Sequence, residues 1–82
     1  AALEVDAHYR AAIEHEPEFA DHFLDFVHFI YRNDESRLKE AREILSKAHA
    51  SMEDNGERAK LERGTREFEE FASRRAHDNS EL

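Results

Sequence analysis

The segment from Phe19 to Arg32 constrains the fold of this chain most, because it is too apolar to be an ordinary surface helix. Its apolar residues recur at intervals of three and four, which is the period of an α-helix. They form a stripe of Phe19, Phe23, Phe26, Val27 and Ile30, widened by Ala20, Leu24 and Tyr31. A helix this broadly apolar has to be covered on two sides. We therefore expect it to be the central element, packed between the segments that precede and follow it.

Two helices are expected to flank this central helix, which should cover about residues 18–32. The first runs over about residues 3–15 and ends before Pro17, because the residue preceding a proline is disfavoured in the α region. The other begins near Ser36, a good N-cap, and extends to about Ser51. Their predicted inner faces are Leu3, Val5, Tyr9, Ala12 and Ile13 in the first, and Leu38, Ala41, Ile44, Leu45, Ala48 and Met52 in the other.

A last helix is expected over about residues 57–76, after the turn signal at residues 54–56. Gly56 is free to adopt a positive φ in that turn, because glycine does so without steric cost. Gly64 weakens the helix by about 1 kcal/mol relative to alanine, and we interpret it as a tolerated weakness rather than a close helix contact. Residues 1–76 should form one α-helical domain, followed by a disordered tail over 77–82. The apolar stripe of the last helix is thin and consists of Leu61, Phe68, Phe71 and Ala72.

A pattern with four-then-three spacing occurs twice in the chain, 36 residues apart. The two copies are Val5-Tyr9-Ala12 and Ala41-Leu45-Ala48. The first copy is followed by Pro17 and then by the aromatic helix. This order resembles tetratricopeptide repeats, including the half-a-TPR variants of RNA-processing scaffolds, over about residues 5–52. The period is longer than the family's usual length of about 34 residues, and the chain has no tryptophan.

The resemblance implies a stack of antiparallel helix pairs with a partner-binding groove. Segments 18–32 and 36–51 would form one complete repeat, with segment 3–15 as the second half of a preceding one and the last helix as a cap. The groove would be lined by the first helix of each pair. In this chain the corresponding positions are Asp21, Leu24, His28, Tyr31 and Arg32. Family members that bind a terminal carboxylate have Lys, Arg or Asn at such positions. The residues of this chain therefore favour a basic or mixed partner instead.

The formal net charge of −8 is concentrated in the first part of the chain. Residues 1–35 contain nine acidic residues and two arginines, a net charge of −7, whereas residues 36–82 carry −1. Such a surface repels phosphate backbones, so we expect no nucleic-acid binding. The charge fits simple solubility or, as the alternative, a basic partner surface. The longest nearly uninterrupted apolar run, residues 26–31, is far shorter than the roughly 20 residues that span a bilayer. We expect a soluble intracellular protein without membrane association, cytoplasmic by default.

The sequence contains no residue pattern typical of a catalytic or metal site. The chain has no cysteine, no glycine-flanked serine elbow and no glycine-rich phosphate loop. His8 and His15 lie seven residues apart, about 10 Å along a helix, which is too far for two ligands of one ion. Helical di-metal sites need carboxylate–histidine pairs on two helices, and only Asp25 and His28 form a related pair here. We therefore expect no enzyme activity, no metal and no cofactor.

The sequence thus predicts an all-α fold of four antiparallel helices, tetratricopeptide-like with a C-terminal capping helix, with an up-down four-helix bundle as the alternative. The predicted function is a protein-interaction or scaffold module that binds a partner protein or peptide through an acidic helical face. Alternatives are a bundle subunit of a larger complex or homo-oligomer, an acidic nucleic-acid-mimicking inhibitor and, least favoured, a helical metal-binding protein. The predicted contact residues are Asp21, Asp25, His28, Tyr31 and Arg32.

Overall fold

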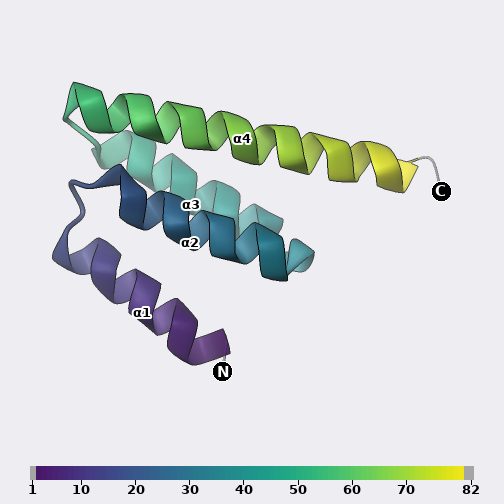
Figure 1. Cartoon of the computed structure of the whole chain (residues 1–82), viewed down its shortest axis with the longest axis horizontal. Coiled ribbons are helices and arrows are strands. Elements are labelled where there is room, and N and C mark those ends of the chain that lie inside the picture. Colours follow the sequence, from purple (N-terminus) through teal and green to yellow (C-terminus); the bar gives the residue numbers. More distant parts are fainter. Residues whose placement is uncertain (1, 81–82) are drawn as a thin grey trace.

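The computed structural model describes residues 2–80, and side chains from residue 4 to residue 75. Four α-helices follow one another in antiparallel order, and no strand occurs over residues 2–80 (Figure 1). The predicted all-α class with four helices is therefore confirmed. The elements are α1 (Ala2–His15), α2 (Ala20–Asn33), the short 3-10 helix η1 (Glu35–Arg37), α3 (Leu38–Ser51) and α4 (Asn55–Ser80).

Helix α2 is the centre of the molecule, as its apolar breadth predicts. It packs against α1, α3 and α4, whereas α1 and α4 lie on either side of it and have no Cα atoms within 8 Å of each other over residues 2–80. Helices α2 and α4 run side by side in the same direction, and α3 lies behind them (Figure 1). The aromatic helix is therefore covered on more than one side.

Apolar side chains from α2, α3 and α4 form the core. Phe26 and Ile30 of α2 have no exposed surface, and Phe68 of α4 is also fully buried. Each such side chain contributes about 1.5–3 kcal/mol relative to an exposed position. The core residues are Ala20, Phe23, Phe26, Val27, Ile30, Ala41, Leu45, Ala48, Met52, Leu61 and Phe68.

Phe19 is an exception to the predicted apolar stripe. It precedes the first helical residue of α2, with φ −101° and ψ 121°, and is 42% exposed. Because its backbone is extended rather than helical, its side chain does not follow the direction that helical spacing implies. The prediction that Phe19 belongs to the buried stripe is wrong.

The two later turns differ in detail from their sequence signals. Asp34, not Ser36, caps the element after α2, because its carboxylate accepts hydrogen bonds from the Ser36 amide at 3.0 Å and from the Ser36 hydroxyl. Gly56 has no positive φ, because α4 already begins at Asn55. The Asp54 carboxylate caps this helix by accepting from the Glu57 amide at 3.0 Å. Gly56 therefore does not use the left-handed conformation that is open to glycine.

Gly64 marks a close approach of α4 to α2. A Cβ atom built on this residue would lie 3.0 Å or less from three side-chain carbons of Leu24. The interpretation of Gly64 as a tolerated weakness is thus wrong, because the missing side chain makes room for Leu24.

Helix α4 is longer than expected. Its backbone is helical to Ser80, beyond the predicted end near residue 76, and its last turns extend past α2 and α3 (Figure 1). Residues 81 and 82 of the predicted tail lie outside the described part of the chain. None of the helices described over residues 2–80 is long and apolar enough to cross a membrane.

Candidate partner-binding surface

The predicted contact residues lie along α2, and three of them line one groove between α2 and α4. These three are Asp25, His28 and Tyr31. The cavity measures about 240 Å³. Asp21 lies outside it and is paired with Lys60 of α4 at 3.8 Å, whereas Arg32 is exposed and also lies outside. The lining of this groove, hereafter the α2–α4 groove, is completed by Leu24, Val27, Gly64 and Glu67.

The floor of the groove is apolar and depends on Gly64. Leu24 and Val27 come from α2, where a spacing of three places them on one side of the helix. Opposite them, Gly64 has no side chain, so the backbone of α4 lies directly against Leu24. Each predicted contact residue of α2 that reaches the groove therefore stands beside an apolar surface.

Tyr31 forms an aromatic wall of the groove. Its half-buried ring lies 4.7 Å from the Phe71 ring and 5.9 Å from the Phe68 ring, and it meets His28 edge-on at 5.0 Å. Burial raises the pKa of the Tyr31 hydroxyl above its ordinary value, and the negative charge of Glu67 adds to this rise. The positive charge of Arg32 opposes it. The phenol is thus neutral at physiological pH and fixed in orientation by the rings around it.

Charge varies systematically along the line of contact between α2 and α4. Near the start of α4, Lys60 lies 3.8 Å from Asp21 and 3.3 Å from Glu57. Farther along α4, Arg75 pairs at 2.8 Å with Glu35 of η1, which follows the last residue of α2 in the chain. A cation of α4 therefore meets acidic groups at both ends of this line.

The middle of the line carries two carboxylates, and no cation among the described side chains pairs with them. Asp25 of α2 and Glu67 of α4 both line the groove, and neither forms an ion pair among the side chains of residues 4–75. The groove is therefore apolar at its floor and negatively charged at its walls.

Sequence reasoning identified the α2 half of this groove but missed the α4 half. Gly64 and Glu67 were not predicted as site residues. Lys60, Gly64, Glu67 and Phe71 recur at intervals of three and four, so they share one side of α4. That spacing is a usable signal, but it does not by itself indicate which helix this side faces.

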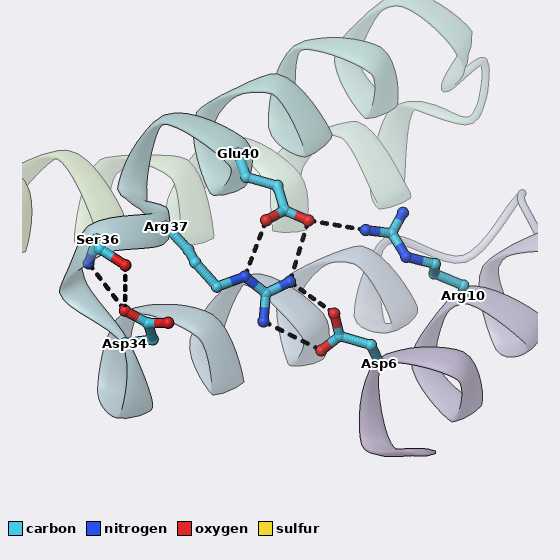
Figure 2. Close-up of polar contacts among 6 residues, drawn as sticks. All are labelled: Asp6, Arg10, Asp34, Ser36, Arg37 and Glu40. Carbon is cyan, nitrogen blue, oxygen red and sulfur yellow. Dashed lines mark hydrogen bonds and ion pairs between the residues drawn. The ribbon is translucent and has the colours of Figure 1, made fainter. Parts of the chain in front are cut away.

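A second network joins α1 to α3 on the other side of α2 (Figure 2). Arg37 of η1 donates to Asp6 at 2.7 and 3.1 Å and to Glu40 at 2.8 and 3.0 Å. Arg10 donates to the same Glu40 at 2.8 Å. These hydrogen bonds, those from Arg37 most of all, lower the pKa of the Glu40 carboxyl below its ordinary value, and the two carboxylates raise the pKa of Arg37.

This network closes one end of a gap that the backbones leave open. No Cα atoms of α1 and α3 approach within 8 Å over residues 2–80. A cavity of about 200 Å³ lies between them, with Phe23 and Phe26 of α2 in its lining. Ile13 and Ile44 also line it, together with Arg10, Glu14 and Lys47. Charged groups of both signs surround this cavity, which therefore favours no one kind of partner.

His22 and His49 take part in separate polar contacts rather than in a shared cluster. His22 lies 3.1 Å from Glu16, and His49 lies 3.0 Å from the hydroxyl of Thr65. Among the described residues, no three His, Asp or Glu side chains are grouped so that they could hold a metal ion.

Comparison of the chain with models of protein families, with curated proteins and with solved structures finds no match. The resemblance to tetratricopeptide repeats therefore stays a prediction from the residue pattern.

Proposed function

We propose that this protein is an interaction module that binds a partner protein or peptide through the α2–α4 groove. The observation that carries the proposal is the combination of an apolar floor with the carboxylates of Asp25 and Glu67, which form no ion pair among the described side chains. An apolar floor provides contact area, and charged walls select the partner and increase its rate of association. Tyrosine is also one of the residue types most often found among the side chains that dominate binding energy, and Tyr31 lines this groove.

The size of the groove supports a peptide rather than a metabolite. Small-molecule sites usually measure about 300–1,000 Å³, which exceeds the value of about 240 Å³ found here. A cavity of this size accommodates one or two side chains of a longer partner. The excess of acidic residues in the first 35 positions favours a basic partner and disfavours nucleic acid. An intracellular setting belongs to the same proposal, because the chain has no cysteine and so no disulfide.

The tetratricopeptide-like assignment is part of this proposal. It is supported by the parallel, side-by-side placement of α2 and α4, which would be the first helices of successive pairs. The exposed outer side of α4 carries Glu62, Arg63, Arg66 and Glu70, and a polar outer side is typical of a helix that ends a stack.

Selection from a random peptide display library on the immobilised protein tests the function. The decisive comparison uses two double variants with the same change in net charge. Asp25→Lys with Glu67→Lys alters the groove, whereas Glu43→Lys with Glu62→Lys alters exposed positions outside it. Circular dichroism establishes that both variants fold.

We expect selected peptides to bind the groove variant roughly tenfold or more weakly and the matched control with nearly unchanged affinity. Failure to select any saturable binder would contradict the proposal. Equal weakening by both double variants would also contradict it, because binding would then follow the net charge rather than the groove.

A further inference from the structure

The arginines of this protein show a recurrent arrangement in which a guanidinium lies over an aromatic ring and pairs with a carboxylate. Arg10 pairs with Glu40, Arg42 with Glu69 at 3.0 Å, and Arg75 with Glu35. The distances from guanidinium carbon to ring centroid are 5.0 Å for Arg10 over Phe26, 5.7 Å for Arg42 over Phe68 and 5.3 Å for Arg75 over Phe71.

The α2–α4 groove contains the aromatic and acidic parts of this arrangement without the arginine. Tyr31 provides the ring, and Asp25 and Glu67 provide carboxylates from two different helices. No guanidinium of a described side chain lies over the Tyr31 ring. Lys60 and Arg75 are both engaged in ion pairs elsewhere along the line of contact, so neither supplies the missing cation.

The same protein also shows how one guanidinium joins two carboxylates from separate elements. Arg37 does so with Asp6 of α1 and Glu40 of α3, through four hydrogen bonds (Figure 2). A planar guanidinium has donors directed to several sides and stacks on aromatic rings, whereas an ammonium group is a compact, strongly hydrated charge. The α2–α4 groove offers two carboxylates and a ring, which is the environment that suits arginine.

We infer that the α2–α4 groove receives one arginine side chain of the partner. The aliphatic stem lies on the floor formed by Leu24 and Gly64, and the guanidinium lies between Asp25 and Glu67 and against the Tyr31 ring. This inference rests on the proposed function and specifies the chemistry of the partner. Arg32 lies outside the groove and repels the incoming cation, so it limits the affinity rather than contributing to it.

The test is an NMR titration of the isotope-labelled full chain with N-acetyl-arginine methylamide in the millimolar range. Nα-acetyl-citrulline methylamide is the matched neutral probe. Nα-acetyl-lysine methylamide, whose side-chain ammonium is free, is the matched cation without a guanidinium. We expect saturable shifts of the Asp25, Gly64 and Glu67 amides with the arginine probe. We expect shifts several-fold smaller with the other two.

Variants link these shifts to the two carboxylates. Asp25→Asn with Glu67→Gln should weaken the binding of the arginine probe roughly tenfold, whereas Glu43→Gln with Glu62→Gln should leave it unchanged. Equal shifts with the citrulline or lysine probe would overturn the inference, as would shifts confined to residues outside the groove. If selected peptides require Asp25 and Glu67 but contain no arginine, the proposed function holds and the arginine inference fails.

Discussion

Arg37 and Asp6 form a two-pronged ion pair at 2.7 and 3.1 Å across 31 positions of the chain. The pair connects η1 to α1, and Arg37 also binds Glu40 in α3. Arg37 therefore joins α1 to α3, two helices with no Cα atoms within 8 Å of each other over residues 2–80. Both partners are mostly shielded, since the side chains of Arg37 and Asp6 are only 21% and 17% exposed. Ion pairs of this kind contribute more to stability than exposed ones.

Replacing Arg37 should therefore loosen α1. We expect Arg37→Ala to lower the free energy of unfolding by about 2 kcal/mol, because Asp6 loses its donor and Glu40 keeps only the hydrogen bond from Arg10. Arg37→Lys should recover only part of this loss, since an ammonium cannot reproduce the fork. Urea unfolding measures the effect. Hydrogen exchange should show that Arg37→Ala increases the exchange rates of the α1 amides more than those of the α4 amides. Lys39→Ala, an exposed change that breaks no ion pair among the described side chains, is the control. A loss no larger than that of this control would contradict the prediction.

The contact between Gly64 and Leu24 predicts an unusual response to alanine. In an exposed helix interior, Gly→Ala stabilises by about 1 kcal/mol. At Gly64 the new Cβ would overlap the Leu24 side chain, so this gain should be absent in the otherwise unchanged protein. It should reappear when Gly64→Ala is made in a Leu24→Ala background. A double-mutant cycle by urea unfolding measures this coupling, and strictly additive effects would show that the two helices do not meet at this point.

The pKa of Tyr31 reports on the charges beside the groove. Glu67 raises this pKa and Arg32 lowers it, whereas burial is the largest cause of its rise. We therefore expect Glu67→Gln to lower the pKa and Arg32→Ala to raise it. Ultraviolet titration in a Tyr9→Phe background isolates the signal, because the chain has two tyrosines. An unchanged pKa in Glu67→Gln would indicate that Glu67 does not face the groove.

Acid should destabilise the protein through Glu40. Its pKa in the folded state lies below the ordinary value of 4.5, chiefly because Arg37 donates hydrogen bonds to it. The unfolded state therefore binds a proton more readily, so this contribution is complete above pH 4.5 and is lost as the pH falls through the folded pKa.

A series of urea midpoints at decreasing pH measures this loss. Glu40→Gln should flatten the dependence on pH in the region below pH 4.5, whereas Glu43→Gln should not, because Glu43 is exposed and forms no ion pair among the described side chains. Parallel curves for Glu40→Gln and the unchanged protein would contradict the assignment.

Local sequence signals predicted the helices and much of the core. Pro17 ended α1 at His15 as expected, and α3 ended at Ser51. The spacing of Phe23, Phe26 and Ile30 correctly identified the buried side of α2. These features follow from the periodicity of one segment and from the backbone preferences of residues beside proline.

The candidate site was predictable only in part. Asp25, His28 and Tyr31 share one side of α2 because of their spacing, and the structure brings all three into the groove. Glu67 could not be assigned to it, because helical spacing does not say which neighbour a side of α4 faces. The position of Glu67 depends on the rotation and axial alignment of α4 against α2.

The sequence by itself determined that this protein is helical, that its aromatic segment is central and that its first part is acidic. The tertiary structure alone decided that Gly64 lies against Leu24, that Arg37 joins Asp6 to Glu40, and that Asp25 and Glu67 line one groove. The physical reason is that helix formation depends on neighbouring residues, whereas the rotation and alignment of packed helices depend on how side chains from distant segments fit together.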